Sequence, residues 1–361
     1  MISYRERLIS KKTRKTADMH PTAVHVKDIG PGTDVLADAI HRIAASVNKN
    51  GVDGPGPYRA ARDLLLRRPP RLADGSPTLM QAGEMTVDAA KRLGTVLKHS
   101  LLAIQGPPGA GKTYTGAHMI VELVKQGKRA GITATSHNVI SNLLGKVIEA
   151  AGEAGLRDLK CVQKVREEER PEQDPPHIQT TVKNPETLAA FLDGAHVLAG
   201  TQWLWAQEDY FESVDVLFVD EAGQMSLANV LSVSQAAKSL VLLGDPQQLD
   251  QPLKGSHPDG AEVSALEHLL AGEKTIRPDK GLFLEKTWRL HPKLCAFTSE
   301  VFYEGRLFSR QGLDRQGIEG HPWMGEYGSG LYQSRMKAIK THPKKKSRWL
   351  VNWSMAYCDP A

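Results

Sequence analysis

An α/β fold, in which helices cover both faces of a parallel sheet, is predicted for this chain by the alternation of two kinds of segment. Between about 84 and 250, short and nearly continuous apolar runs are separated by amphipathic stretches. The apolar runs are LLAIQ, RAGIT, HVLAG, VDVLFVD and SLVLLGD, and the amphipathic stretches include TYTGAHMIVELVKQ and VISNLLGKVIEAAG. Strands that are apolar on both faces are typical of parallel sheets buried between helices, because each crossover connection contains a helix.

The composition is that of an ordinary globular protein. The 361 residues are 40% apolar and 24% charged, which suggests two domains or one large domain with appendages. The chain has no apolar run long enough for a membrane span or a secretory signal, so no membrane association is predicted. Cys161, Cys295 and Cys358 are far apart and lack metal-ligand spacing, which favours a reducing, cytoplasmic location. The net charge of +5 permits a polyanionic partner without requiring one.

The periodicity divides the chain into four predicted regions. An N-terminal helical and linker region contains TDVLADAIHRIAASV and YRAARDLLLRRPP, and Pro69 and Pro70 should end the second of these helices. The alternating region follows, and a second αβ pattern begins near residue 260 with EVSALEHLL. The predicted regions are 1–83, 84–258, 259–332 and 333–361.

Two segments are predicted to lie outside the packed core. The interval from about 164 to 185 is charged and rich in proline, which indicates a surface insertion or a mobile loop. The run 335–348 is basic, with a dense cluster at Lys344, Lys345, Lys346 and Arg348. Such a run is typical of a disordered, solvated tail, and an electrostatic contact with nucleic acid is the alternative.

A loop that holds nucleotide phosphates is predicted at IQGPPGAGKT, residues 104–113. It follows an apolar run and precedes a helix-like segment, as a phosphate loop does, whereas a glycine-rich turn would match the pattern alone. Glycines let backbone N–H groups point at the phosphates; Lys112 would reach the β- and γ-phosphates, and the Thr113 hydroxyl would bind Mg²⁺. The residues expected to surround the nucleotide are Gly106, Pro107, Pro108, Gly109, Ala110, Gly111, Lys112, Thr113 and Tyr114.

Polar groups follow the next apolar runs. Asp220 and Glu221 end VDVLFVDEAGQ, at the edge where a parallel sheet binds its ligand. One carboxylate could hold Mg²⁺ and the other could deprotonate an attacking water, so the pair indicates hydrolysis; a solvated acidic turn is the alternative. GDPQQL, at 244–249, places Gln248 where a side chain could sense the γ-phosphate, although by itself this stretch would be an ordinary turn.

The order and spacing of GPPGAGKT, DEAGQ and GDPQQL resemble those of superfamily-1 helicases, in the branch of the RNA-surveillance helicase of nonsense-mediated decay and its DNA-replication relatives. Further similar motifs are ITATSHNVISNLL at 132–144, VLAGTQWLW at 197–205 and LEKTWRLHPKLCAFTSEVFYEGRL at 284–307. More narrowly, PYRAARDLLLRRPPRL and the motor region resemble the helicase half of bacterial RecB-like nuclease–helicase fusion proteins. The resemblance covers about 57–332 and implies a RecA-like P-loop NTPase fold.

The resemblance also implies a role for individual residues. ATP and Mg²⁺ would be bound by Lys112 and Thr113, with Asp220 as metal ligand and Glu221 as the base. Gln248 would sense the γ-phosphate, and Arg289 would stabilise transition-state charge from a second domain across the cleft.

Four residues would lie near the backbone of a single-stranded nucleic acid: Ser136, Asn138, Gly200 and Thr201. The nuclease-fusion resemblance favours DNA over RNA. For Trp203 and Trp205, buried core aromatics are the preferred interpretation over platforms for base stacking.

The sequence departs from the family in two places. The glutamine that recognises adenine is missing, and Ala89 stands near its expected place, so preference for ATP over other nucleotides is not predicted. No further nucleic-acid motif or second arginine follows Leu331. We therefore expect an incomplete second RecA-like domain in a truncated motor that cannot unwind alone. A separate polypeptide could supply the missing part of the motor or a nuclease.

Three functions remain open. The leading one is the ATP-binding and ATP-hydrolysing motor domain of a superfamily-1 DNA helicase. A nucleotide-dependent switch that binds nucleic acid or protein without translocation is the alternative. A small-molecule P-loop kinase would need a lid arginine pair and a substrate pocket, and the sequence has no sign of either.

Overall fold

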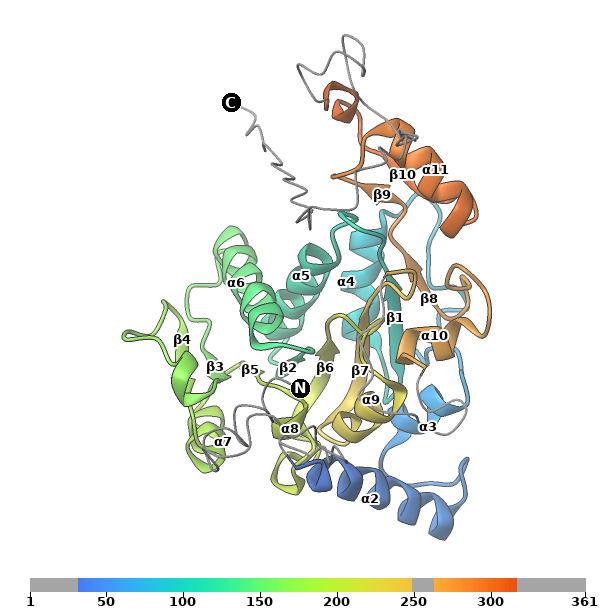
Figure 1. Cartoon of the computed structure of the whole chain (residues 1–361). Coiled ribbons are helices and arrows are strands. Elements are labelled where there is room, and N and C mark those ends of the chain that lie inside the picture. Colours follow the sequence, from blue (N-terminus) through green and yellow to red (C-terminus); the bar gives the residue numbers. More distant parts are fainter. Residues whose placement is uncertain (1–31, 249–262, 317–361) are drawn as a thin grey trace, which may run out of the picture.

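The computed structural model describes residues 32–248 and 263–316, and its centre is one sheet of eight parallel strands (Figure 1). The strand order is β4-β3-β5-β2-β6-β7-β1-β8, and every described pairing in it is parallel. The strands are β1 (Leu101–Gln105), β2 (Ala130–Thr133), β3 (Cys161–Lys164), β4 (Ile178–Thr181), β5 (Val197–Ala199), β6 (Val214–Val219), β7 (Ala237–Gly244) and β8 (Gly281–Phe283).

Helices cover both faces of the sheet, as the apolar runs predicted. Alternate residues of one strand enter different cores: Leu101 and Ala103 belong to one hydrophobic cluster, and Leu102 and Ile104 to the other. The second cluster is completed by α4 (Thr86–Val96), α5 (Lys112–Lys125) and α6 (His137–Glu153). The first is completed by α3 (Arg59–Leu65), α7 (Asn184–Leu192), α8 (Gln202–Trp205), α9 (Leu227–Ser234) and α10 (Ala265–Leu270). The RecA-like α/β prediction is therefore confirmed.

The predicted N-terminal helix forms α2 (Asp34–Asn50), which packs outside this layer against α8 and α9. Its buried residues Leu36, Ala39 and Ile43 are three and four positions apart, so they form one stripe facing the protein. The Arg42 guanidinium also donates two hydrogen bonds, of 2.8 and 3.0 Å, to the Gln235 side chain. These bonds attach α2 to the residue that follows α9.

The segment from 164 to 185 contains a strand, so its interpretation as a surface insertion or mobile loop was wrong in part. It holds the 3-10 turn η1 (Glu167–Glu169) and the edge strand β4, which pairs with β3. The strand IQTT is short and polar, and only its last two residues are buried. An edge strand of this kind lacks the apolar run that identifies the inner strands.

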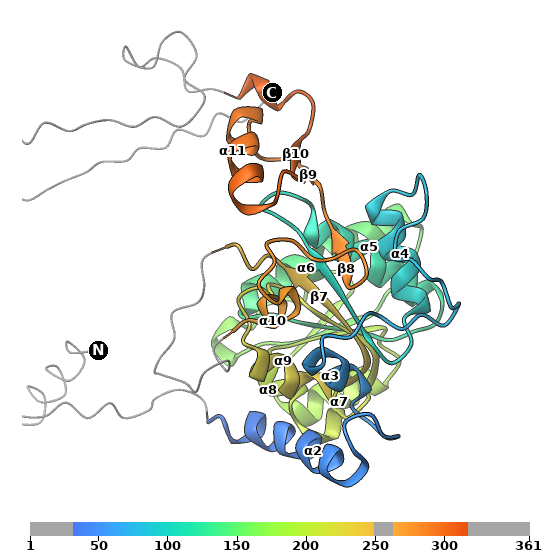
Figure 2. The same cartoon turned by 90° about the vertical axis from the view of Figure 1, so that its right-hand side faces the viewer.

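The predicted range 259–332 contributes one strand to the main sheet, because β8 pairs with β1, the strand before the phosphate loop. A small unit follows, residues 286–316, which we call the β9–β10 unit. It contains β9 (Lys286–Thr287), α11 (Pro292–Phe302), β10 (Phe308–Ser309) and the turn η3 (Leu313–Arg315). The unit lies beyond the carboxyl ends of the strands (Figure 2). Its status as the start of a second RecA-like domain stays a prediction; 317–332 and the basic tail lie outside the described residues, as does Cys358.

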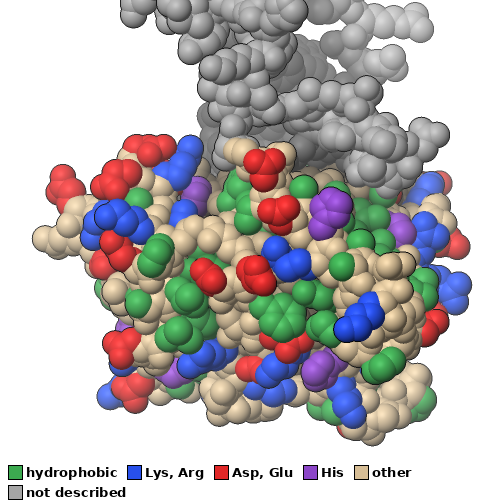
Figure 3. All heavy atoms as spheres, turned by 90° about the horizontal axis from the view of Figure 1, so that it is seen from below, with side chains coloured by type: hydrophobic (Ala, Val, Ile, Leu, Met, Phe, Trp, Pro, Cys, Tyr) green, Lys and Arg blue, Asp and Glu red, His purple; other side chains and the backbone are tan. Residues whose placement is uncertain are grey.

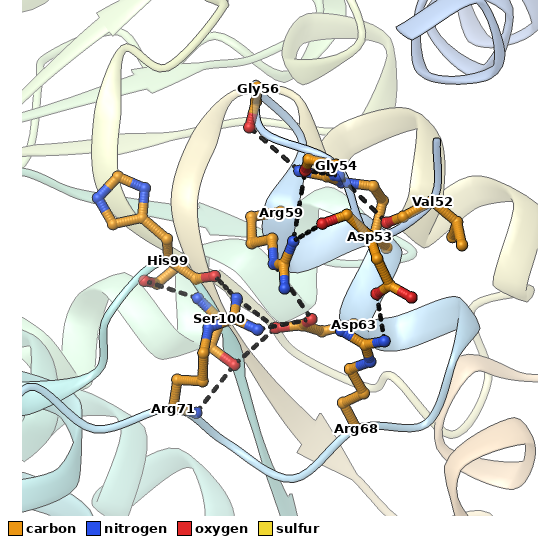
Figure 4. Close-up of polar contacts among 12 residues, drawn as sticks. Val52, Asp53, Gly54, Gly56, Arg59, Asp63, Arg68, Arg71, His99 and Ser100 are labelled. Carbon is orange, nitrogen blue, oxygen red and sulfur yellow. Dashed lines mark hydrogen bonds and ion pairs between the residues drawn. The ribbon is translucent and has the colours of Figure 1, made fainter. Parts of the chain in front are cut away.

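A polar cluster joins α3 to the start of β1 (Figure 4). The Asp63 side chain is only 1% exposed, and its carboxylate accepts from Arg71 at 2.8 Å and from the Ser100 hydroxyl at 3.0 Å. Arg71 in turn donates to the His99 carbonyl. A buried carboxylate with a bidentate arginine and a hydroxyl partner orders the two elements relative to each other.

We predict that Asp63→Asn lowers the free energy of unfolding by about 2 kcal/mol, less than for a fully buried pair because Arg71 is partly exposed. Asp53→Asn is the matched control, since Asp53 pairs with Arg68 but its side chain is 62% exposed. Its cost should stay below about 0.5 kcal/mol. Urea unfolding of both variants measures the difference, and equal costs would contradict a structural role for the Asp63 cluster.

Candidate nucleotide site

The predicted phosphate loop connects β1 to α5, in the strand–loop–helix context that the motif requires. Gly109 and Gly111 have positive φ angles of 73° and 89°, and Gly111 is the residue immediately before α5. These conformations suit glycine and strain other residues. They let the loop curve around the N-terminus of α5, where free N–H groups and the helix dipole favour an anion.

Lys112 lies across this loop. Its Nζ donates to the Gly106 carbonyl at 2.8 Å. A Cβ built on Gly106 would lie 2.4 Å from the Lys112 Cγ, so a side chain at 106 would displace the lysine. Thr113 is half-buried in the first turn of α5, and Tyr114 is exposed with its ring 4.0 Å from that of His118.

The two predicted carboxylates directly follow β6. Asp220 is 3% exposed, and its Oδ1 accepts from the Glu221 backbone N–H at 2.9 Å. Burial, together with the neighbouring Glu221 charge, raises the pKa of Asp220 to about 6, although the bond from the Glu221 N–H and the Lys112 charge act in the opposite direction. Asp220 forms no ion pair with any described residue. A cation placed beside this buried carboxylate would therefore favour its ionised form.

Two glycines bring the turn after β6 against the turn after β7. A Cβ on Gly223 would lie 2.5 Å from the Asp245 carbonyl oxygen, and one on Gly244 would lie 2.5 Å from the Gly223 nitrogen. The Ala222 N–H donates to the Leu243 carbonyl at 2.8 Å. Direct backbone contact thus fixes the carboxylates of the first turn relative to the Gln248 side chain of the second.

Asp245 organises the second turn. It is 1% exposed, and its Oδ1 accepts from the Gln247 N–H at 3.2 Å. Its Oδ2 accepts from the Gln248 amide at 3.3 Å and from the Tyr303 hydroxyl at 2.7 Å. Sequence reasoning identified Gln248 but assigned no role to Asp245 or Tyr303, although both belong to the motifs GDPQQL and FYEG.

Arg289 lies beside the phosphate loop, 180 positions away in sequence from Gly109. A Cβ on Gly109 would lie 2.4 Å from the Arg289 Cβ. The Trp288 N–H donates to the Gly109 carbonyl at 2.9 Å, and the Thr287 hydroxyl donates to the Pro108 carbonyl at 3.0 Å. The Arg289 side chain is exposed and has no hydrogen-bond or ion-pair partner among residues 32–248 and 263–316. Thr287 was not predicted; its place in the motif KTWRLHP was the available signal.

The four candidate nucleic-acid residues follow two adjacent strands, β2 and β5. Ser136 caps α6 by accepting from the Val139 N–H at 3.4 Å, and both Ser136 and Asn138 are exposed. Gly200 is buried, and its N–H donates to the Ile132 carbonyl at 3.0 Å; Thr201 is half-buried. The four residues therefore lie along one edge of the sheet, and of these only Ser136 and Asn138 are exposed.

The two tryptophans lie within the fold. Trp205 is fully buried, and its indole N–H is shared between the carbonyls of Ile132 and Gly200. Trp203 is partly buried against Leu36 and its neighbours. The interpretation as core aromatics is confirmed for Trp205 and agrees with the packing of Trp203. Ala89, near the place where the family has its adenine-recognising glutamine, is fully buried in α4.

Comparison with known proteins points to ATPases and helicases. Residues 87–259 match the model of a family described as an AAA domain. The ATP-dependent helicase NAM7 of Saccharomyces cerevisiae is 25% identical over 334 residues, which cover 81% of this chain and 33% of NAM7. The DNA replication ATP-dependent helicase/nuclease dna2 of Schizosaccharomyces pombe is 26% identical over 262 residues, which cover 68% of this chain and 18% of dna2. Among solved structures, Arterivirus nonstructural protein 10, a helicase in complex with DNA, gives a TM-score of 0.39 at 16% identity, covering 61% of this chain and 43% of that one.

The sheet and the phosphate loop have the architecture of a RecA-like P-loop fold, and the sequence is similar to that of ATP-dependent helicases. Both of these curated relatives are named as ATP-dependent helicases, and the identity to each is modest. The chain spans a third or less of the length of the two curated relatives. Within the described ranges, no helix has both the length and the apolar composition needed to cross a membrane.

We predict that Gly109→Ala destabilises the protein more than its backbone angle explains, because the new methyl group would push the Arg289 segment away from the loop. Gly127→Ala is the matched control, since Gly127 has nearly the same φ, 72°, and open space around its Cβ position. The control should cost about 1 kcal/mol of unfolding free energy, and Gly109→Ala about 2 kcal/mol more. Equal costs in denaturant unfolding would contradict the close packing of the two segments.

Proposed function

We propose that this chain is the ATP-binding and ATP-hydrolysing motor domain of a superfamily-1 helicase that acts on single-stranded nucleic acid. The observation that carries the proposal is that three segments lie together at one edge of the sheet. The phosphate loop, the carboxylates after β6 and the Arg289 segment all meet at the carboxyl edge of the sheet. A kinase gains nothing from a water-activating carboxylate at this position, so the carboxylate pair favours hydrolysis.

The loop and α5 bind the nucleotide in this proposal. Backbone N–H groups and the N-terminus of α5 hold the phosphates, and Lys112 exchanges its bond to the Gly106 carbonyl for the terminal phosphates. Glu221 orients the attacking water and accepts its proton. Arg289, in the segment that packs against Gly109, stabilises the charge that develops on the γ-phosphate.

Magnesium fits the residues at this site. A buried carboxylate at Asp220 and a hydroxyl at Thr113 are the oxygen ligands that Mg²⁺ takes when nucleotide phosphates provide the others. When bound with the nucleotide, the ion neutralises phosphate charge. Asp220 and Thr113 would hold the ion. Glu221 has a left-handed backbone conformation, with φ of 54°, so the chain changes direction there after β6. Glu221 would then be free to accept the proton of the attacking water.

Nucleic acid would bind along the neighbouring part of the same edge, after β2 and β5. Its contacts there would be mostly with phosphates, through Ser136, Asn138 and the backbone around Thr201, so binding should weaken as salt rises. DNA is our preferred substrate over RNA on the nuclease-fusion resemblance. The chain could act on DNA alone or only with a second polypeptide. Stimulation of its ATP turnover by single-stranded DNA, with no other protein present, would favour action alone.

We predict that Glu221→Gln lowers the turnover of Mg-ATP by roughly 100-fold or more while nucleotide binding is kept, because the amide cannot take a proton. Turnover with and without single-stranded DNA, together with equilibrium binding of a fluorescent ATP analogue, measures both. Lys112→Ala should lose binding as well and supplies the blank. Lys125→Ala, at the exposed far end of α5, is the control lysine and should match the unmodified protein.

If the wild-type protein binds ATP but shows no turnover, with or without DNA, the hydrolase proposal is overturned. The nucleotide-dependent switch would then be favoured. Full turnover by Glu221→Gln would remove Glu221 from the role of base.

We predict that Asn138→Asp weakens binding of single-stranded DNA by about fivefold at low salt, since one negative charge is added beside the phosphates. The loss should shrink as salt is raised. The helix should tolerate the change, because an acid in the first turn suits the helix dipole.

Asn48→Asp is the matched control for that experiment. Asn48 is exposed on α2, which lies at the other end of the molecule from the β9–β10 unit (Figure 1). The face seen from that end mixes acidic and basic side chains (Figure 3). Fluorescence anisotropy of a labelled oligonucleotide measures both variants. Equal losses of affinity in the two variants would show that the overall charge of the protein determines DNA binding and that Asn138 makes no specific contact.

A further inference from the structure

Tyr303 joins the β9–β10 unit to the turn that follows β7. It is the residue after α11, it is 2% exposed, and its hydroxyl donates to the Asp245 Oδ2 at 2.7 Å. Its ring packs near that of Phe283 in β8, with centroids 5.9 Å apart. A short, buried bond from a hydroxyl to a carboxylate is among the stronger neutral-to-charged hydrogen bonds.

The oxygen that Tyr303 holds is also the partner of Gln248. Asp245 Oδ2 accepts from the Gln248 amide at 3.3 Å, a longer bond than the one from Tyr303. With the Tyr303 hydroxyl in place, Oδ2 is satisfied and the amide of Gln248 is bound weakly. Without that hydroxyl, the buried carboxylate would need another donor, and the Gln248 amide is the donor already in contact with it.

Other contacts hold the end of α11 in the same position. Lys274 Nζ donates to the Val301 carbonyl at 2.8 Å, and the Thr275 hydroxyl donates to the Glu304 carboxylate. The preceding loop is tied to β1, because the Gln105 side chain accepts from the Ile276 N–H at 2.7 Å and donates to the Lys274 carbonyl at 3.0 Å. These bonds hold Tyr303 against Asp245 as long as the β9–β10 unit is docked.

The β9–β10 unit is thus attached at two points around the candidate nucleotide site. Thr287 and Trp288 bind the phosphate loop, and Tyr303 binds the turn after β7. Arg289 and Gln248, the two groups expected at the γ-phosphate, lie at these two attachments.

We propose that Tyr303 is a positioning residue that controls Gln248 through Asp245, and that it couples the orientation of Gln248 to the docking of the β9–β10 unit. The inference rests on the proposed ATPase function. By occupying Asp245 Oδ2, the hydroxyl frees the Gln248 amide to turn toward a γ-phosphate. When the unit moves away, Asp245 takes up the amide and Gln248 is withdrawn from the nucleotide.

The test is Tyr303→Phe, which removes the hydroxyl and keeps the ring. We expect kcat for Mg-ATP to fall about tenfold while KM stays within about twofold, because nucleotide binding does not use this bond. In a Gln248→Ala background, Tyr303→Phe should cause no further loss, because the side chain through which it acts is gone. Asp245→Asn provides a second approach to the same link and should lower kcat without raising KM.

Tyr210→Phe is the matched control. Tyr210 is also fully buried, and its hydroxyl also makes one bond, to the Asn184 carbonyl at 3.0 Å, on the far side of the sheet from the phosphate loop. Its loss should lower the thermal midpoint as Tyr303→Phe does and leave kcat unchanged.

The outcomes separate the two proposals. Turnover by the unmodified protein no higher than that of Lys112→Ala overturns the ATPase itself. Normal wild-type turnover with an unchanged kcat for Tyr303→Phe overturns the role of Tyr303 alone. A loss for Tyr303→Phe that adds to that of Gln248→Ala, or one matched by Tyr210→Phe, also overturns it, because a general loss of packing would act independently of Gln248.

Discussion

The close contact between the turn after β6 and the turn after β7 is the constraint on which the site depends. Gly223 and Gly244 have no room for a Cβ, so the two backbones touch directly. This contact sets the distance between a carboxylate pair and an amide that come from separate strands. Any side chain at either glycine would push the turns apart and, with them, every group that both turns carry. The parallel sheet allows the arrangement, because all its strands end at the same edge.

The inner part of the fold could be predicted from sequence because its signal is local. LLAIQ, VDVLFVD and SLVLLGD correspond to β1, β6 and β7, which are buried on both faces and need only an apolar run to be recognised. The strands β3 and β4 were not predicted, because CVQK and IQTT contain polar residues and owe their place to pairing with a neighbour. β8 has three residues, and its partner β1 lies far away in the chain.

The candidate site shows the same division. Motif order and spacing were sufficient to place Lys112 after β1, and Asp220 and Glu221 after β6, two strands that end at the same edge of the sheet. The bonds from Thr287 to the phosphate loop and from Tyr303 to Asp245 span 179 and 58 positions, and nothing local in the sequence specifies them. The residue roles, the division into domains, the similarity to nuclease fusions and the truncation stay predictions.

The helices α2 and α3 have a practical consequence for how this protein is divided. Ile43 of α2 and Ala60, Ala61 and Leu64 of α3 are buried in the same cluster as β1 and β7. The family match begins at residue 87, downstream of both helices, and ends at 259, before β8. A fragment cut at those limits would lose α2, α3, α10 and β8, which would expose part of one apolar face of the sheet and leave β1 as an open edge, and both invite aggregation. The region that matches the family model is therefore smaller than the set of helices and strands that pack together.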